Sequence, residues 1–366
     1  MAGSTYGTNF RITTWGESHG TALGAVIDGC PAGLKINEEY IQAFLNRRKP
    51  GQSKYTTARA EGDEVEILSG VFEGRTTGTP ISLMVRNTDH HSADYSEIAS
   101  YYRPGHADLT FDEKYGFRDY RGGGRSSGRE TIGRVAAGAV AIKLLEELNI
   151  KVLTYTKSVG SINVDTDKFD IEEINNNPLY MPDAQAAKKA CDFLDDLKKK
   201  GDSAGGCVEC RITGMPAGVG EPVFDKLDAA LAKALMSIGA VKAVEIGDGI
   251  TAAGSTGSNN NDAFHTQDGR IVKMTNHSGG ILGGMSDGSE IILRAHIKPT
   301  PSISMEQETV NKGGQDIRIN IKGRHDPIIV PRAVVVVESM AAITLADLLM
   351  INMSARMDNL KKIYLF

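Results

Sequence analysis

The sequence predicts an α+β fold, in which antiparallel sheets and helices form one structural unit. Six runs have the alternating or β-branched pattern of strands, at residues 64–68, 79–85, 151–162, 205–214, 289–298 and 316–322. They do not alternate regularly with the helical segments, which disfavours a doubly wound parallel sheet. No low-complexity linker divides the 366 residues, so we expect a single domain over residues 1–366.

Three helices are predicted from their amphipathic spacing and their end signals. Asn37 can cap a helix over residues 38–48. Asp183 precedes a second helix over residues 184–200, and Gly201 follows it as a stop signal. Asp225 is the expected cap of a third helix over residues 226–238.

A fourth helix is expected over residues 130–149, after a glycine-rich loop. Ser127 and Glu130 have the spacing of a capping box. Gly133 and Gly138 inside this helix each cost about 1 kcal/mol relative to alanine. Close approach of another helix is the expected reason for both glycines.

One internal echo suggests two related halves within the domain. The spacing is shared by two sets of residues: Gly70, Gly74, Gly78 and Ile81, and Gly280, Gly284, Gly288 and Ile291. Each set leads into a predicted strand. Chance similarity in a chain with 41 glycines is the alternative.

Composition and charge exclude several classes of protein. The chain is 40% hydrophobic and 24% charged, with a net charge of −5. A protein that coats nucleic acid usually carries the opposite sign, so nucleic acid is not an expected partner. The N-terminus lacks the apolar core of a signal peptide, and Glu338 and Asp347 interrupt the most apolar run, at 333–350. We therefore expect a cytoplasmic protein with no membrane span.

Four cysteines are too few for a disulfide scaffold in a chain of this length. Cys207 and Cys210 form a CxxC pair, but a zinc site would need a second pair. The pair also lies in a strand-like run, whereas a redox CxxC begins a helix. Two strand residues on opposite faces are the simplest interpretation, and a metal or redox site is the alternative.

Basic residues gather in turn-rich loops, which is unusual in a net acidic protein. These residues are Arg47, Arg48, Lys49 and Lys54; Arg103; Arg118, Arg121, Arg125 and Arg129; and Arg324 with His325. Arginine binds phosphate and carboxylate with two parallel hydrogen bonds. The pattern indicates a polyanionic small molecule as the ligand.

Two histidines lie in tight loops and could act as general acids or bases. They are His19, within GESHG, and His106, within RPGHAD. The loop RGGGRSSGRET leads into a helix, and its N–H groups suit an anion. Its glycine spacing matches a P-loop, but Arg129 and Glu130 stand where lysine and a hydroxyl residue belong.

Several of these motifs together closely resemble chorismate synthase. They include GESHG at 16–20, RPGHAD at 103–108, YRGGGRSSGRET at 120–131 and GRHDP at 323–327. RRKPGQSKYTT, GVFEGRTTGTPI, PAGVGEPVFDKLDA, VEIGDG and GGILGG extend the similarity in order from about residue 5 to about residue 350.

The resemblance implies both a reaction and an architecture. Members of this family are lyases that eliminate phosphate from 5-enolpyruvylshikimate 3-phosphate by an anti 1,4-elimination. The product is chorismate, at the last step of the shikimate pathway to aromatic amino acids. Reduced FMN is required although there is no net redox change. The implied fold is a β-α-β sandwich with a helical layer between antiparallel sheets, assembled as a homotetramer.

The resemblance also implies roles for individual residues. His19 would protonate the departing phosphate, His106 would supply a proton at the flavin, and Asp326 would help accept the ring proton through the flavin N5. Ser18 and Ser127 would orient these groups. Substrate binding carries over to Arg48, Lys54, Arg103, Arg129 and Arg324. Flavin contacts carry over to Arg125, Ser126, Ser127, Gly239, Ala240, Gly283, Lys298, Pro299, Thr300, Pro301, Ser302 and Arg324. No metal is implied.

The chain departs from the family pattern at three positions. His91 stands where a basic residue is common, Gly239 replaces asparagine or proline, and Ala204 replaces isoleucine. The sequence shows no strand–GxGxxG–helix unit for a nicotinamide, which favours an external flavin reductase but leaves NADPH open as the reductant. A phosphate-binding kinase or NTPase and an RNA-binding module are the competing hypotheses. Protection against unfolding by nucleotide with Mg²⁺ would favour the kinase or NTPase. An affinity for RNA that falls steeply with salt would favour the RNA-binding module.

Overall fold

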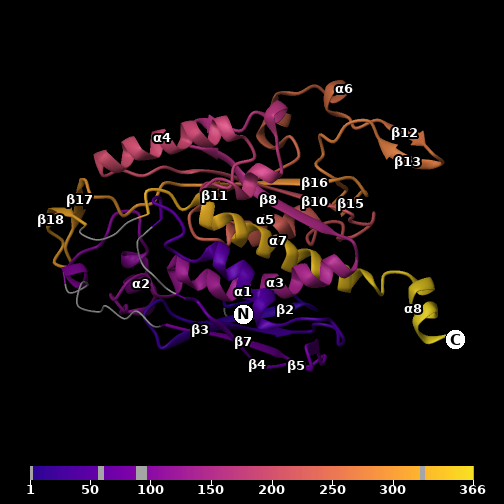
Figure 1. Cartoon of the computed structure of the whole chain (residues 1–366), viewed down its shortest axis with the longest axis horizontal. Helices are drawn as coiled ribbons and strands as arrows, with labels where there is room; N and C mark the ends of the chain where they lie inside the picture. The colour runs from indigo at the N-terminus through magenta and orange to yellow at the C-terminus, as the bar shows by residue number, and fades with distance from the viewer. Residues whose placement is uncertain (1–2, 57–61, 88–96, 322–325, 366) are drawn as a thin grey trace.

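Two antiparallel sheets enclose a layer of helices in the computed structural model of the chain (Figure 1). The structure describes residues 3–56, 62–87, 97–321 and 326–365. The predicted α+β class and the sandwich with its internal helical layer are both confirmed.

The two sheets each have five strands. The first has the order β1 (Thr5–Tyr6), β2 (Arg11–Gly16), β3 (Ala22–Asp28), β7 (Ile81–Arg86) and β4 (Val65–Ser69). The second has the order β11 (Val241–Ile246), β16 (Ile291–Ile297), β10 (Gly206–Thr213), β8 (Lys151–Val159) and β9 (Ile162–Asn163). Neighbouring strands pair antiparallel in both sheets. The sequence prediction missed β1, β2, β3 and β11.

Four helices make the layer between the sheets: α1 (Glu38–Arg48), α3 (Thr131–Glu147), α5 (Leu227–Met236) and α7 (Val330–Asn352). The helix α7 is long and apolar enough to cross a membrane by length and composition, but 83% of its most apolar window is buried within the protein. Its four consecutive valines, 334–337, are helical although valine favours strands, because burial on all sides of the helix outweighs propensity.

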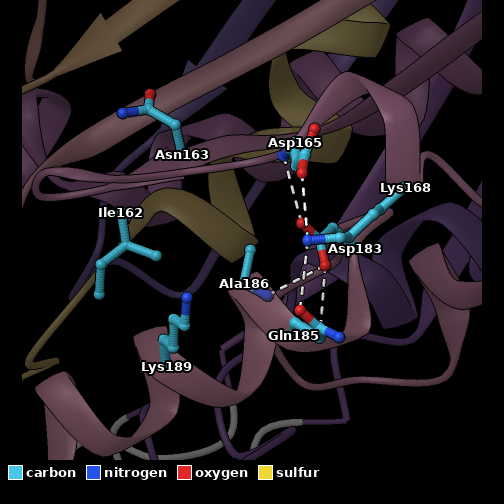
Figure 2. A pocket seen from close by; sticks show the side chains of 8 residues that line it. All are labelled: Ile162, Asn163, Asp165, Lys168, Asp183, Gln185, Ala186 and Lys189. Atoms are coloured by element: carbon cyan, nitrogen blue, oxygen red, sulfur yellow. Dashed lines mark hydrogen bonds and ion pairs between the residues drawn. The ribbon is translucent and has the colours of Figure 1, made fainter.

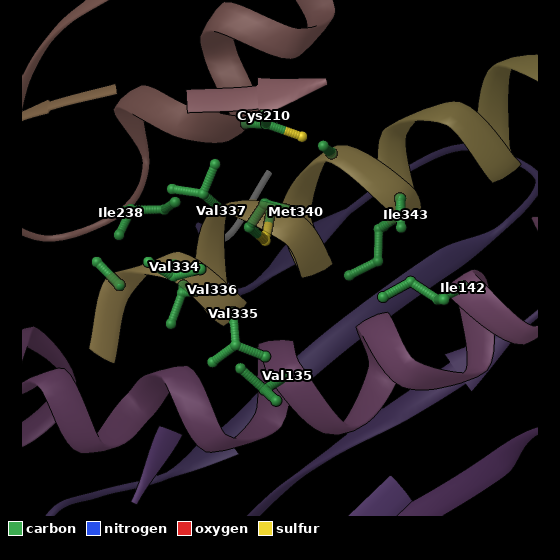
Figure 3. Close-up of a cluster of buried hydrophobic side chains, with 14 of the residues drawn as sticks. Val135, Ile142, Cys210, Ile238, Val334, Val335, Val336, Val337, Met340 and Ile343 are labelled. Atoms are coloured by element: carbon green, nitrogen blue, oxygen red, sulfur yellow. The ribbon is translucent and has the colours of Figure 1, made fainter. Parts of the chain in front are cut away.

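The helices α3 and α7 pack closely at the centre of the core. Figure 3 shows Val135 and Ile142 of α3 facing α7. A Cβ atom on Gly138 would lie 2.2 Å from Cβ of Ser339, so the predicted close helix approach is confirmed at this glycine. Gly133 instead faces a strand, because a Cβ atom there would lie 2.6 Å from the carbonyl oxygen of Gly24 in β3.

The remaining elements lie outside this sandwich. They are the helices α2 (Asp108–Tyr115), α4 (Ala184–Lys200), α6 (Gly257–Asn260) and α8 (Met357–Tyr364), and the hairpins β5–β6 (Val71–Phe72, Arg75–Thr76), β12–β13 (Phe264–Gln267, Arg270–Lys273), β14–β15 (Ile281–Leu282, Met285–Ser286) and β17–β18 (Glu306–Val310, Asp316–Asn320). The predicted strand at 316–322 is therefore one arm of a hairpin and belongs to neither large sheet.

Two predicted caps are confirmed and one is wrong. The Asn37 side chain accepts a hydrogen bond from the Tyr40 N–H, and the Asp183 side chain accepts from the first turn of α4. The helix α5 begins at Leu227 after Lys226, without a side-chain cap. Asp225 does not cap this helix, because its position lies two residues before the first helical residue.

Candidate functional site

The turn between β2 and β3 carries Ser18 and His19. The triple-glycine loop lies directly against this turn, because a Cβ atom on Gly122 would lie 2.7 Å from Nε2 of His19 and 3.4 Å from Oγ of Ser18. Gly122 also has a φ angle of +105°, which side-chain-bearing residues rarely adopt. Only glycine fits here, and the loop therefore comes close to both predicted catalytic side chains.

The rest of the glycine-rich loop is held by its own side chains and by β2. The Ser126 hydroxyl donates to the carbonyl of Gly123 at 2.6 Å. Arg125 donates from Nη1 to the carbonyl of Gly16 at 3.0 Å and from Nη2 to the carbonyl of Thr14 at 3.1 Å. Arg125, a predicted flavin contact, therefore also fixes the loop to β2.

The predicted capping box is only half formed. Ser127 Oγ accepts from the Arg129 N–H at 3.2 Å, as an N-cap side chain should. Glu130 does not reach back to Ser127. Its carboxylate accepts from Thr14 Oγ1 at 2.9 Å and from Arg134 Nε at 2.8 Å, because a short 3₁₀ turn precedes α3 and directs Glu130 towards β2.

Arg103 joins the loop at 103–108 to the triple-glycine loop. Its guanidinium donates to Asp108 from Nε at 2.8 Å and from Nη2 at 2.7 Å, and Nη2 also reaches the carbonyl of Gly122 at 3.4 Å. Arg103 is 9% exposed. The buried ion pair holds Arg103 beside the loop that touches His19.

His106, on the same loop, faces the segment at 298–302. Its Nε2 lies 2.8 Å from Oγ of Ser302. Lys298 Nζ donates to the carbonyl of Gly105 at 2.9 Å, and a Cβ atom on Gly105 would lie 2.7 Å from Cβ of Pro301. The predicted proton donor and a predicted flavin-binding segment are therefore adjacent.

Gly239 and Ala240 also lie beside this segment, whereas Gly283 does not. The Lys298 N–H donates to the carbonyl of Ala240 at 2.9 Å. Gly283 lies in the β14–β15 turn that precedes β16, and Lys298 follows β16. Seven strand residues span roughly 20 Å. Gly283 is therefore at the opposite end of the strand from the other predicted flavin contacts.

Two predicted substrate-binding arginines share one buried carboxylate. Asp63 accepts from Arg48 Nη1 at 2.9 Å and from Arg129 Nη1 at 3.0 Å, and its side chain is fully buried. Arg48 also donates to Thr131 Oγ1 at 3.2 Å and to the carbonyl of Gly128 at 3.3 Å. Asp63 thereby fixes the separation of the two guanidinium groups at the start of α3.

Arg332 connects Asp326 to Arg48, one of these two arginines. Arg332 donates from Nη1 to Asp326 Oδ2 at 2.7 Å and from Nε to the carbonyl of Arg48 at 3.1 Å. Burial, with the charges of Arg332 and Arg129, lowers the pKa of Arg48 to about 9, which leaves it charged at neutral pH. Three guanidinium groups thus surround two carboxylates, an arrangement suited to an added anion.

One predicted substrate-binding residue, Lys54, is not brought to this cluster. Lys54 is largely exposed and pairs with Asp195 of α4 at 2.6 Å. Arg324 lies outside the described residues, and so does His91, the departure from the family pattern.

Sequence reasoning did not single out Asp63, Asn87 or Arg332. Asn87 Oδ1 accepts from Arg129 Nε at 2.6 Å, and the contacts of Asp63 and Arg332 are with Arg48. Single acidic, amide and basic residues carry no local signal. Only Asn87 had a signal of this kind, because it lies four residues before His91, a departure from the family pattern.

The assembled residues fit a polar, anionic group. The hydroxyls of Ser18 and Thr300 are buried without a hydrogen-bond partner among the described residues, which is uncommon for buried polar atoms. One lies in the turn that carries His19, and the other lies in the segment that contacts His106. Both hydroxyls could therefore form hydrogen bonds with a bound polar group, such as the reduced FMN that the resemblance implies.

A separate cavity of about 290 Å³ lies between β9 and the start of α4 (Figure 2). Asp183 caps the helix there and also accepts from the Asp165 N–H at 3.2 Å, while Lys168 pairs with Asp165 at 3.1 Å. These polar groups satisfy one another, and no residue of the predicted site lines the cavity.

The CxxC pair is buried and unreactive. Burial raises the pKa of Cys207 and of Cys210 to about 12, so both remain thiols at neutral pH. Both are free cysteines. Across the described ranges, no three His, Cys, Asp or Glu side chains are grouped to hold a metal ion.

Comparison with known proteins decides the family. A sequence profile of chorismate synthase matches residues 10–350. The chain belongs to the chorismate synthase family. It is 68% identical over 364 residues to chorismate synthase of Agathobacter rectalis, covering 100% of this chain and 99% of the relative. It is 57% identical over 352 residues to that of Methanocella arvoryzae, covering 95% and 94%.

A solved structure agrees with this assignment. The crystal structure of a chorismate synthase superimposes with a TM-score of 0.77 at 33% sequence identity, covering 98% of this chain and 96% of the other. The chain is therefore an enzyme, a carbon–oxygen lyase of the chorismate synthase family.

Proposed function

We propose that this lyase converts 5-enolpyruvylshikimate 3-phosphate to chorismate and phosphate by anti 1,4-elimination, with reduced FMN as cofactor. The observation that carries the proposal is the convergence of four separate loops. Turn 17–21, loop 103–108, loop 121–129 and segment 298–302 meet through the contacts of Gly122, Arg103 and His106. Such a convergence of basic and titratable groups is expected of an active site.

The arginine cluster is suited to the anionic substrate. Arg48, Arg129 and Arg332 carry three positive charges against the two carboxylates of Asp63 and Asp326. Phosphate or carboxylate groups bound here would form charge-assisted hydrogen bonds, each contributing about 1.5–3 kcal/mol. Arg103 and Arg324 extend this set in the proposal. Lys54 does so only if it leaves its partner Asp195.

The proposed proton transfers use residues from different loops. His19 donates a proton to the departing phosphate, with Ser18 orienting the group. His106 holds a proton beside the segment 298–302, and Asp326 helps to take up the ring proton, with Arg332 fixing its carboxylate at 2.7 Å. Reduced FMN, when bound, supplies the transient electron density that the elimination requires.

The cofactor would be held by residues beside His106. We propose contacts with Lys298, Pro299, Thr300, Pro301 and Ser302, together with Gly239, Ala240, Arg125, Ser126 and Ser127. A homotetramer would allow Gly283 of a second copy to approach the flavin, because within one chain it lies at the far end of β16. A cytoplasmic location and an external flavin reductase complete the proposal, with NADPH as the alternative direct reductant.

An anaerobic assay tests the proposed function. Purified protein with chemically reduced FMN and 5-enolpyruvylshikimate 3-phosphate should release chorismate and phosphate in equal amounts. Oxidised FMN should abolish both. A folded protein that binds FMN and releases neither product would contradict the proposal.

A further inference from the structure

Asn87 occupies a junction between the two parts of the candidate site. It directly follows β7, and β7 pairs with β3 so that Arg86 lies opposite Ala22. The residue after β7 is therefore placed beside the β2–β3 turn. The Asn87 N–H donates to the carbonyl of Thr21 at 3.0 Å, which continues the strand pairing into the turn.

The side chain of Asn87 connects the turn to the arginine cluster. Its Nδ2 donates to the carbonyl of Glu17 at 3.1 Å and to that of Gly20 at 2.6 Å. Its Oδ1 accepts from Arg129 Nε at 2.6 Å. The residue is 8% exposed. Only this orientation of the amide places donors on carbonyls and the acceptor on a guanidinium.

We propose that Asn87 is a positioning residue that fixes the Ser18–His19 turn relative to Arg129. The inference rests on the proposed function, in which the acid on the turn and the guanidinium act on one anionic group. Glu17 and Gly20 flank Ser18 and His19. The two hydrogen bonds from the Asn87 amide therefore hold the turn on both sides of these two residues. A misplacement of about 1 Å can cost about 100-fold in rate.

The substitution Asn87→Asp separates the two functions of the side chain. An aspartate keeps an oxygen to accept from Arg129 but turns a second oxygen towards the two carbonyls, so the turn is released. We expect kcat to fall by about 10- to 100-fold with little change in KM for the phosphate substrate. Hydrogen–deuterium exchange of a peptide covering residues 16–22 should become faster.

Asn177 provides a matched control. Its Nδ2 donates to the carbonyls of Glu173 and Met181, each at 2.8 Å, in a loop outside the predicted site. Asn177→Asp should lower the melting temperature but leave kcat and the exchange of residues 16–22 unchanged. If Asn87→Asp does not fold, Asn87→Ala takes its place, with kcat falling and KM rising because Arg129 also loses its hydrogen bond to the Asn87 side chain.

Two results would overturn the proposal. The first is unchanged exchange in the 16–22 peptide of a folded Asn87 variant. The second is a loss of kcat that Asn177→Asp shares equally. An inactive wild-type protein would instead contradict the proposed function, and the exchange measurement would still decide the role of Asn87.

Discussion

The two halves of the sandwich share the order of four strands but differ in the connections between them. This order is β2-β3-β7-β4 in the first sheet and β8-β10-β16-β11 in the second. The fifth strand differs, because β1 precedes β2 in the chain whereas β9 follows β8. A central helix lies between the third and fourth strands along the chain in each half, α1 or α5, and another follows the last strand, α3 or α7. This shared order is what two related halves would give, and their common origin remains a prediction.

The echo in glycine spacing corresponds to matching local structure. Gly70 and Gly280 both have φ angles of +81°, and each precedes a two-residue-strand hairpin. Ile81 and Ile291 then begin β7 and β16 and are almost fully buried. The repeated glycines therefore mark the same turns in both sheets, because only glycine adopts these backbone angles without strain.

The halves differ most where β2 meets β3. Five residues, 17–21, connect these strands, whereas the corresponding strands β8 and β10 are separated by residues 160–205, which include β9 and α4. The short turn carries Ser18 and His19 against the glycine-rich loop. The second half instead contributes residues after β16. The repeated strands and helices therefore form the core, while the candidate site residues lie in connections that are not repeated.

The largest expected effect comes from replacing the histidine on the short turn. His19→Ala should lower kcat by about 10²- to 10⁴-fold, because a positioned proton donor contributes that much. His277→Gln is the control in the second half, where His277 Nδ1 pairs with Asp248 at 2.7 Å outside the predicted site. The anaerobic chorismate assay measures both variants. Equal losses would contradict the placement of the chemistry on the short turn.

The next effect compares ion pairs in the two halves. Asp63→Ala removes the buried carboxylate that Arg48 and Arg129 share and should lower the free energy of unfolding by about 3–5 kcal/mol. Glu290→Ala removes the partner of Arg211 at 2.6 Å, where both side chains are a quarter to a third exposed. Its loss should be about 1 kcal/mol or less. Urea unfolding checks both values. Similar losses of unfolding free energy in the two variants would contradict a strong stabilising role for the buried Asp63 carboxylate.

A third prediction concerns Asp262, at the base of the β12–β13 hairpin, which has no counterpart in the first half. Burial opposes ionisation of this carboxylate. Hydrogen bonds from Ser278, Thr275 and the His277 N–H outweigh burial and hold its pKa well below its usual range. Its ionised form therefore adds stability above the unfolded pKa of about 4, and this stability disappears as the pH falls towards the folded pKa.

Asp262→Asn should consequently lose about 2 kcal/mol at neutral pH. The difference from wild type should shrink as the pH falls below about 4. Urea midpoints measured over a pH series give the result. A difference that stays constant with pH would contradict the ionised state of Asp262.

The smallest effect tests the equivalence of the two halves directly. Gly78 and Gly288 have φ angles of +81° and +89°, and an added Cβ atom would meet nothing closer than 3.4 Å in either place. Alanine at each position should therefore cost about 1 kcal/mol through backbone strain alone. Thermal unfolding of the two variants should agree. A clear difference would mean that the echoed turns are not structurally equivalent.

Sequence alone predicted the helices α1, α3, α4 and α5 and the loop motifs better than the sheets, but it did not predict the central helix α7. End signals such as Asn37 and Asp183 are local, so the bounds of α1 and α4 were predictable. The strands β2 and β3 were missed, because glycines and polar residues interrupt their alternation. The sandwich itself came from the resemblance, since no periodicity shows how two sheets stack.

The candidate site was predictable as a set of motifs but not as a set of contacts. The meeting of His106 with Ser302 joins residues 196 positions apart, and Arg332 reaches the Arg48 carbonyl across 284. Such contacts depend on the packing of β7, α3 and α7 and leave no local pattern. Lys54 shows the converse, because its motif is present while its side chain points to α4.

The most direct test of this account is to map where the ligands bind. Hydrogen–deuterium exchange of the wild-type protein would be compared with and without oxidised FMN and 5-enolpyruvylshikimate 3-phosphate together. If the four loops form the binding site, the ligands should slow exchange in residues 16–21, 103–108, 121–129 and 298–302, which belong to both halves. Protection confined to the cavity between β9 and α4, with none in these four loops, would contradict it.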